Sequence, residues 1–294
     1  MNKNDTPSKP SHDVRLLLVD DDPSAILAMS RMLTQYAHQR FATSGQEALQ
    51  LAREATPDLI LLDADMPGMT GFDVCLALKS DPALAHVPVI FASSYNIPQL
   101  EVAALENGAV DFVTKPLIAA QLTARVRARL RDSQLARETQ RDLAGSARAT
   151  LPRLLIVDDD VAALRILYRT LLTIGEINYV TSSEEALPLA RLIGPDLILL
   201  DNQMNGLDGF AVCKALKAEQ AFRHVPVVFV SSFSDPRTER HAFDLGAADF
   251  IAKPYAPAVM KARVRNLLER VHLRSSQRYC TDRSRHTFID KVSA

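Results

Sequence analysis

The sequence contains no tryptophan, few cysteines and almost no net charge. Its 294 residues include three cysteines, and the formal net charge is −1. Cys75, Cys213 and Cys280 are too few and too widely spaced for a disulfide framework or a cysteine metal site. A net charge near zero gives no general basic surface for nucleic acid or acidic membranes, so neither is expected as a direct partner.

Long hydrophobic runs are also missing. A run such as residues 59–62 has the length of a strand and is followed by a charged residue, which argues against a membrane-spanning helix. Residues 1–13 lack the apolar centre of a secretory signal and are expected to form a disordered leader. Hydrophobic residues make up 47% of the chain, enough for more than one core. Length and composition therefore predict a soluble, cytoplasmic protein of two domains.

The chain contains an internal repeat. Residues 15–130 align with residues 153–268 without a gap, and about half of the aligned positions are identical, which composition alone does not produce. The period is too long for solenoid repeats, so the repeat indicates a duplicated domain. The predicted divisions are a leader (1–13), a first domain (14–131), a helical linker and hinge (132–151), a second domain (152–271), and a tail or the start of a missing output segment (272–294).

Within each copy, short apolar runs alternate with amphipathic stretches of helical length. In the first copy, strands are predicted at 15–19, 39–42, 58–62, 88–92 and 110–113, and helices at 24–36, 45–54, 71–79, 98–107 and 118–131. The apolar runs do not alternate with polar residues, which is typical of strands that are buried on both faces. This pattern predicts an α/β fold with a parallel sheet between helices.

The same polar residues follow the predicted strands in both copies. They are Asp20, Asp21, Asp22, Asp63, Ser93 and Lys115 in the first copy and Asp158, Asp159, Asp160, Asp201, Ser231 and Lys253 in the second. The carboxyl ends of parallel strands share one edge of the sheet, so these residues are expected to converge. Clustered carboxylates resist joint ionisation, and Mg²⁺ with oxygen ligands would relieve the repulsion.

A lysine and a hydroxyl beside such a metal suit a phosphoryl group, for which a carboxylate is a suitable nucleophile. Alternatively, the acids after the first strand cap the helices that follow. This alternative is favoured for Asp22 and Asp160 taken alone. It does not explain the whole set, which is repeated in register.

The segments that carry these residues resemble the receiver domain of bacterial two-component response regulators. They read VDDD, PDLILLDADMPGMTGFD, VPVIFASS and GAVDFVTKP in the first copy, and VDDD, PDLILLDNQMNGLDGF, VPVVFVSS and GAADFIAKP in the second. The likeness covers residues 15–131 and 153–270. It implies two doubly wound, flavodoxin-like (βα)5 domains with five-stranded parallel sheets. It also implies a phosphoacceptor signalling protein rather than an enzyme, with at most slow autophosphatase activity.

The resemblance assigns the same roles in both copies. The phosphoacceptors would be Asp63 and Asp201. The Mg²⁺ ligands would be Asp20, Asp21, Asp63 and the carbonyl of Asp65, and in the second copy Asp158, Asp159, Asp201 and the carbonyl of Gln203. Ser93 and Ser231 would be the switch hydroxyls, and Lys115 and Lys253 the lysines that pair with the phosphoryl group.

The resemblance also assigns roles to two further sets of residues, each of which has a purely structural explanation as an alternative. Phe112 and Phe250 would be the switch aromatics, with ordinary core packing as the alternative. Asp111 with Arg125, and Asp249 with Arg263, resemble a charged dimerisation face, with a solvated surface as the alternative.

The two copies depart from the family pattern in places that bear on phosphorylation. The proline four residues past the acceptor is Pro67 in the first copy but Asn205 in the second, which predicts a looser second loop. Tyr95 and Phe233 stand two residues past the switch hydroxyls. These bulky rings are expected to impede the water that hydrolyses an acyl phosphate, which predicts long-lived phosphorylation.

The implied function is a tandem-receiver response regulator. A sensor histidine kinase or phosphotransfer protein would phosphorylate Asp63, Asp201 or both, which would change homodimer formation or the activity of a partner or output domain. Only 24 residues follow Arg270, so the chain could be the N-terminal regulatory part of a cyclic-di-GMP synthase-type regulator. A phosphate sink, in which one copy does no chemistry, is another alternative.

An enzyme of another class is disfavoured. A phosphatase of the haloacid dehalogenase type has its aspartate nucleophile after the first strand, whereas Asp63 follows the third.

Overall fold

The computed structural model describes residues 13–140, 151–204, 208–232 and 235–270, with only the backbone for residues 134–140. The chain divides into two compact units, residues 1–134 (unit 1) and 135–294 (unit 2). The predicted leader, hinge and tail lie largely outside the described residues, and so do Asn205 and Phe233.

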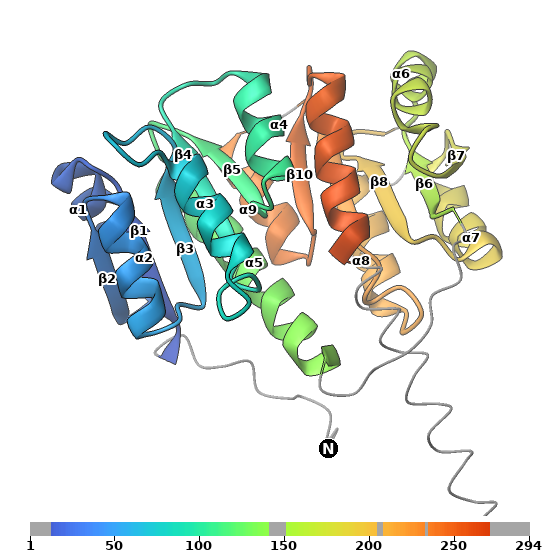
Figure 1. Cartoon of the computed structure of the whole chain (residues 1–294). Helices are drawn as coiled ribbons and strands as arrows, with labels where there is room; N and C mark the ends of the chain where they lie inside the picture. Colours follow the sequence, from blue (N-terminus) through green and yellow to red (C-terminus); the bar gives the residue numbers. More distant parts are fainter. Residues whose placement is uncertain (1–12, 141–150, 205–207, 233–234, 271–294) are drawn as a thin grey trace, which may run out of the picture. The chain divides into compact units, whose positions relative to one another are not determined.

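Unit 1 is built around a parallel sheet with the strand order β2-β1-β3-β4-β5 (Figure 1). Its strands are β1 (Arg15–Val19), β2 (His38–Ala42), β3 (Leu59–Asp63), β4 (Val89–Ser93) and β5 (Asp111–Thr114). Its helices are α1 (Pro23–Met32), α2 (Gly45–Glu54), α3 (Gly71–Ser80), α4 (Pro98–Glu106) and α5 (Ala119–Gln140). Every residue of β3 and β4 is buried, as the unbroken apolar runs predict.

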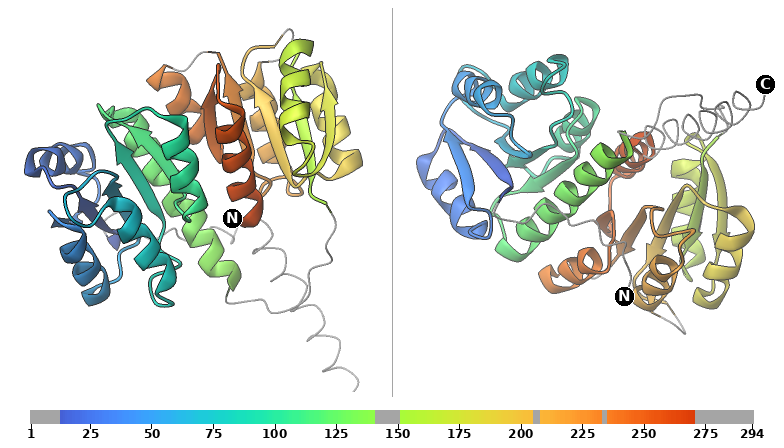
Figure 2. Two further views of the ribbon diagram at one scale, coloured as in Figure 1. Left: turned by 45° about the horizontal axis from the view of Figure 1, so that its top comes forward. Right: turned by 90° about the horizontal axis from the view of Figure 1, so that it is seen from below.

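Alternate residues of each strand supply two separate hydrophobic cores. Ile60 and Leu62 belong to a core shared with α2 and α3, whereas Leu59 and Leu61 belong to one shared with α1 and α5. Because successive side chains of a strand point to opposite faces, helices must cover both faces of the sheet. The helices flank the sheets in all views (Figures 1 and 2).

Unit 2 repeats this architecture, with the strand order β10-β9-β8-β6-β7. Its strands are β6 (Arg153–Val157), β7 (Glu176–Val180), β8 (Leu197–Asp201), β9 (Val227–Ser231) and β10 (Asp249–Ala252). Its helices are α6 (Val161–Leu171), α7 (Ser183–Ile193), α8 (Gly209–Ala218) and α9 (Pro236–Asp244), and residues 257–270 are also helical. The predicted fold class, two α/β domains with five-stranded parallel sheets, is confirmed.

One helix is shorter than its apolar pattern suggested. Residues 24–36 were expected to be helical, but α1 ends at Met32. The side-chain amide of Gln39 donates to the carbonyls of Leu33 (2.9 Å) and Tyr36 (3.0 Å) and so holds the turn that follows the helix. Leu33 and Tyr36 are buried without being helical, so the apolar pattern continues past the end of the helix.

A close backbone contact positions the start of α3 above β3. A Cβ on Gly71 would lie 2.1 Å from the carbonyl oxygen of Asp63, and a Cβ on Gly209 would lie equally close to that of Asp201. Only glycine fits at such a distance. This contact holds the loop that follows each of these aspartates against the end of its strand.

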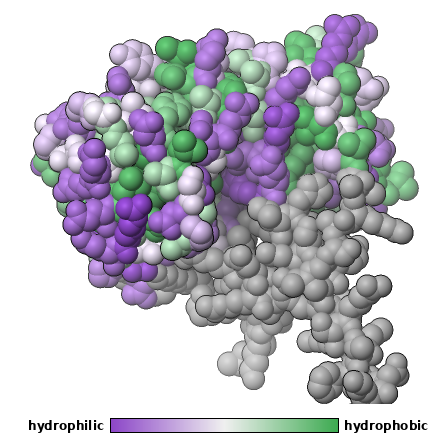
Figure 3. All heavy atoms as spheres, viewed as in Figure 1, coloured by the Kyte–Doolittle hydropathy of each residue, from purple (hydrophilic) through white to green (hydrophobic). Residues whose placement is uncertain are grey.

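The visible surface mixes hydrophilic residues with scattered hydrophobic ones (Figure 3). Within the described ranges, no helix has both the length and the apolar character that crossing a membrane would require.

Candidate functional site

The carboxyl ends of β1, β3 and β5 bring an acidic pair and a lysine of unit 1 together. Lys115 Nζ lies 2.7 Å from Asp20 Oδ2 and 2.5 Å from Asp63 Oδ1. Asp20 and Asp63 are 1% and 5% exposed, so these charges interact with little screening by solvent.

Unit 2 contains the same arrangement. Lys253 Nζ lies 2.8 Å from both Asp158 Oδ2 and Asp201 Oδ2, and both carboxylates are buried. The peptide bond between Lys253 and Pro254 is cis, as is the equivalent bond after Lys115.

Backbone amides hold the second oxygen of each carboxylate. Asp65 N donates to Asp63 Oδ2 (3.0 Å), and Gln203 N donates to Asp201 Oδ1 (3.1 Å). Asp20 Oδ1 accepts in the same way from the backbone N–H two residues further on, at 3.1 Å. Each of these carboxylates is therefore fixed between a lysine and a backbone N–H group, which preorganises the site.

Burial and ion pairing act in opposite directions on the pKa of each group, and the net pKa shifts of Asp63 and Lys115 are both upward. Burial raises the pKa of the Asp63 carboxyl, and the hydrogen bond from Lys115 only partly offsets this effect. Burial lowers the pKa of the Lys115 ammonium, but hydrogen bonds to Asp20 and Asp63 outweigh it, and the net shift is upward. The pKa values of Asp158 and Lys253 are raised for the same reasons. Each site thus keeps its lysine charged beside a carboxylate, Asp63 or Asp158, whose ionisation burial disfavours.

The acidic groups fit a divalent cation. Ligand oxygens of Asp20, Asp21 and Asp63 all lie within 4.8 Å of one another, and the equivalent triad of unit 2 meets the same limit. Mg²⁺ prefers hard oxygen donors and keeps several waters, which suits a buried pair of acids beside a third that is exposed in unit 1 and half-buried in unit 2. The carbonyls of Asp65 and Gln203 stay predicted ligands.

The third acid after β1 and β6 has a different role. Asp22 accepts from Ser24 N and Asp160 accepts from Ala162 N, both at 2.8 Å. The capping interpretation is therefore confirmed for these two residues.

The predicted switch residues lie beside the site and are buried. Ser93 is 1% exposed, and its Oγ accepts a hydrogen bond from Tyr95 N (3.1 Å). Ser231 is fully buried at the equivalent place. Phe112 and Phe250 are 4% and 3% exposed, a burial that both the switch and the core-packing interpretations require.

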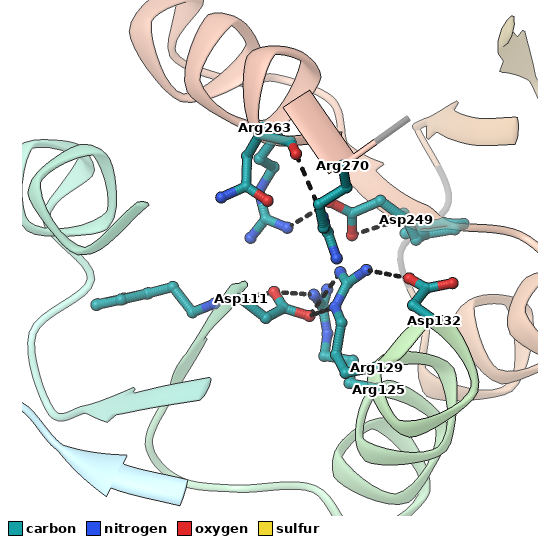
Figure 4. Close-up of polar contacts among 10 residues, drawn as sticks. Asp111, Arg125, Arg129, Asp132, Asp249, Arg263 and Arg270 are labelled. Atoms are coloured by element: carbon teal, nitrogen blue, oxygen red, sulfur yellow. Dashed lines mark hydrogen bonds and ion pairs between the residues drawn. The ribbon is translucent and has the colours of Figure 1, made fainter. Parts of the chain in front are cut away.

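The charged residues of the predicted dimerisation face pair within their own units. Asp111 accepts from Arg125 Nη1 (2.8 Å) and from Nε (3.0 Å) and Nη2 (2.8 Å) of Arg129 (Figure 4). Asp249 accepts from Arg263 Nη1 at 2.8 Å. A dimer through this face stays a prediction. The sequence analysis missed Arg129, although it lies one helical turn after Arg125.

Tyr255 is a second residue that the sequence analysis missed. It follows Pro254, and burial raises the pKa of its phenol to about 12, with smaller effects from the charges of Lys253 and Asp158. Unit 1 has Leu117 at this position, so the phenol near Lys253 and Asp158 has no counterpart in unit 1.

A family model described as the response regulator receiver domain matches residues 16–127 and 154–265. The chain belongs to the response regulator receiver family. Units 1 and 2 are thus two receiver domains in tandem, and the predicted family is confirmed.

The similar proteins include two that are longer than this chain. The chain is 33% identical over 271 residues to "Response regulator PleD" of Caulobacter vibrioides, an alignment that covers 87% of this chain and 59% of that protein. It is 40% identical over 119 residues to a "Probable cyclic di-GMP phosphodiesterase" of Vibrio cholerae, which covers 40% of this chain and 27% of that protein. The chain therefore spans about three fifths or less of these relatives.

A solved structure is also similar to part of the chain. It is the signal receiver domain of a signal transduction histidine kinase from Syntrophus aciditrophicus, 33% identical, covering 40% of this chain and 90% of that one, with a TM-score of 0.38.

Proposed function

We propose that both receivers accept phosphoryl groups, on Asp63 and Asp201, from a sensor histidine kinase or phosphotransfer protein. The lysine-bridged acidic pocket, which occurs in both units with nearly the same geometry, supports this proposal. Phosphorylation then changes dimerisation or the activity of a partner or output domain.

The transfer uses side chains of these sites together with a phosphohistidine donor and Mg²⁺. A carboxylate oxygen of Asp63 attacks the phosphorus of a phosphohistidine, the P–O bond forms as the P–N bond breaks, and the donor imidazole takes a proton from solvent. Lys115 pairs with the phosphoryl oxygens, and the hydroxyl of Ser93 donates to one of them. When bound by the acidic triad, Mg²⁺ supplies further neutralisation of the phosphoryl charge.

In this proposal the two receivers are phosphoacceptors, and the protein is not an enzyme that acts on other substrates. The only catalytic step is slow hydrolysis of their own acyl phosphate, which regenerates the carboxylate of Asp63 or Asp201 and releases inorganic phosphate.

A second candidate concerns the output. The chain aligns with part of a longer response regulator, and another relative is named for cyclic di-GMP. These observations favour a regulatory role within a longer protein of cyclic di-GMP metabolism, of which the synthase-type regulator expected from the sequence is one form. An open reading frame that continues past Ala294 into an output domain would support this role.

Counting phosphates tests the main proposal. The wild-type chain, Asp63→Asn, Asp201→Asn and the double variant are incubated with Mg²⁺ and phosphoramidate or acetyl phosphate, and intact masses are measured. We expect up to two phosphates on the wild type, one on each single variant and none on the double variant.

Each departure from this pattern has a definite meaning. A single variant without phosphate would identify the remaining unit as a receiver without chemistry. A phosphorylated double variant would contradict the assigned acceptors. Multiple-turnover release of phosphate from a small monoester would instead support the phosphatase alternative.

A further inference from the structure

Unit 1 contains a cavity of about 290 Å³ that is separate from its acidic pocket. The cavity lies at the amino ends of β1 and β2, whereas the acidic pocket lies at the carboxyl ends of the strands. Ligand-binding cavities have volumes of about 300–1,000 Å³. The volume of this cavity is close to the lower limit of that range, so it suits one small molecule.

Part of the lining of the cavity is apolar. It comes from Ala37, from Leu51 and Ala55 at the end of α2, and from Pro57. Ligand cavities are lined mostly by apolar side chains, with a few polar groups that fix the orientation of the ligand. Alanine and proline side chains are short, so this part of the lining suits a flat ring.

The polar part of the lining includes three basic residues that project from the same face of the sheet. Arg15 pairs in register with His38, and Leu17 pairs with Arg40. Successive side chains of a strand point to opposite faces, and Leu17 belongs to the core that α2 covers. Arg15, His38 and Arg40 therefore share the face on which α2 lies, and all three line the cavity.

Arg40 neutralises the negative groups that are nearest to the cavity. Its Nη1 donates to the carbonyl of Leu51 (3.1 Å), and its Nη2 donates to Glu54 Oε2 (2.6 Å). The carboxyl end of a helix carries a partial negative charge, which would repel an anion. Arg40 offsets both this partial charge and the carboxylate of Glu54.

The side chains of Arg15 and His38 are available to a ligand. Both residues are exposed, and among the residues that the structure describes neither side chain makes a hydrogen bond or an ion pair. A guanidinium binds a phosphate group with two parallel hydrogen bonds, and an imidazole offers an N–H donor. An anionic group in the cavity would gain these hydrogen bonds without breaking a contact of the fold.

Unit 2 does not repeat this distribution of charge. Arg153 is the equivalent of Arg15, but Glu176 stands in place of His38. Glu176 pairs in register with Arg153, so a carboxylate lies beside the guanidinium on the neighbouring strand. The excess of positive charge at this corner of the sheet belongs to unit 1.

We propose that the cavity of unit 1 binds a small phosphate monoester with a flat ring, the chemistry of a nucleoside monophosphate. Arg15 and His38 donate to the phosphate group, and the ring packs on Ala55 and Pro57. This site is independent of the proposed phosphorylation, because none of its residues belongs to the acidic pocket.

Binding of adenosine 5′-monophosphate to the full chain tests this inference. Calorimetric titration in the presence of EDTA measures the affinity without divalent cations, so that the acidic pockets, which have a net negative charge, repel the nucleotide. The ¹H–¹³C methyl signal of Ala55, assigned with Ala55→Ser, locates the bound nucleotide. Adenosine, which lacks the phosphate, and inorganic phosphate, which lacks the ring, are the comparison probes.

We expect saturable binding that shifts the Ala55 signal, with an affinity at least about tenfold higher than that of either comparison probe. Arg15→Gln should weaken binding by about 10- to 100-fold, because a hydrogen bond to a charged group is lost. His38→Ala should weaken it several-fold. Arg153→Gln, the matched change in unit 2, should leave the affinity unchanged. Arg15 and His38 are exposed, so their variants should fold as the wild type does.

Three results would overturn the inference. They are the absence of saturable nucleotide binding, equal affinities of the wild type and Arg15→Gln, and nucleotide binding that leaves the Ala55 signal unchanged. None of them would bear on Asp63 as a phosphoacceptor, which the phosphate count tests separately.

Discussion

Replacing Lys115 by methionine should destabilise unit 1 by about 3 kcal/mol at neutral pH. Lys115 Nζ lies 2.7 Å from Asp20 Oδ2 and 2.5 Å from Asp63 Oδ1, and both carboxylates are buried. Removing one partner of a buried ion pair costs about 3–5 kcal/mol, because the charge left behind has no compensation. The lysine side chain is 22% exposed, which favours the lower end of that range.

The loss should depend on pH in a defined direction. The folded pKa of Lys115 is raised, so its ion-pair stabilisation is present at all pH values below the unfolded pKa of about 10.4 and is constant between pH 5 and 8. In the variant, the pKa of Asp63, already raised by burial, rises further. A carboxyl group whose pKa is raised in the folded state stabilises that state at low pH. This stabilisation is lost as the pH rises through the raised pKa. The deficit of the variant should therefore grow from pH 5 to pH 8.

Urea unfolding followed by hydrogen exchange of peptides from residues 15–130 measures the stability of unit 1 within the full chain. Arg31→Met, at an exposed cationic residue of unit 1, should stay within about 0.5 kcal/mol of wild type. Mg²⁺ should restore part of the stability lost in Lys115→Met, since it neutralises the same carboxylates. A deficit below about 1 kcal/mol, or one equal at pH 5 and pH 8, would refute the electrostatic account of the site.

Three other changes probe the site and its surroundings. Tyr95→Ala should hydrolyse the acyl phosphate of Asp63 several-fold faster, as ³²P decay would show; an unchanged half-life would contradict the shielding hypothesis. Gly71→Ala should lower the free energy of unfolding by about 3 kcal/mol in urea titrations, because its Cβ would lie 2.1 Å from the Asp63 carbonyl oxygen; a neutral effect would mean that the loop adjusts freely. Burial raises the thiol pKa of Cys75 and Cys213 to about 11. In a Cys280→Ser variant at pH 8, both thiols should therefore react with a disulfide reagent only after the protein unfolds. Fast labelling of the native protein would contradict this.

The parallel sheet, and the meeting of the polar residues at one of its edges, could be predicted from the apolar runs and the residues that follow them. The runs before Asp63 and Asp201 are apolar at every position, which requires burial on both faces and hence a parallel sheet. The end of α1 was not predictable, because the turn that follows it is held by Gln39 of the next strand, which donates to the carbonyls of Leu33 and Tyr36.

The contact between Phe210 and His241 in unit 2 shows the same limit at the level of side chains. His241 and Phe210 are 31 positions apart, and the contact between them exists because α8 and α9 pack against the same sheet. No spacing in the sequence distinguishes His241 from an ordinary exposed residue of an amphipathic helix.

By itself, the order of residues determined that each half contains acids, a serine and a lysine at the ends of buried strands, since parallel strands direct their carboxyl ends to one edge. Only the tertiary structure decided that Lys115 bridges two dehydrated carboxylates and that Arg129 joins Arg125 on Asp111. The reason is physical. Strand periodicity is a property of neighbouring residues, whereas dehydration and side-chain contact depend on which distant segments pack together.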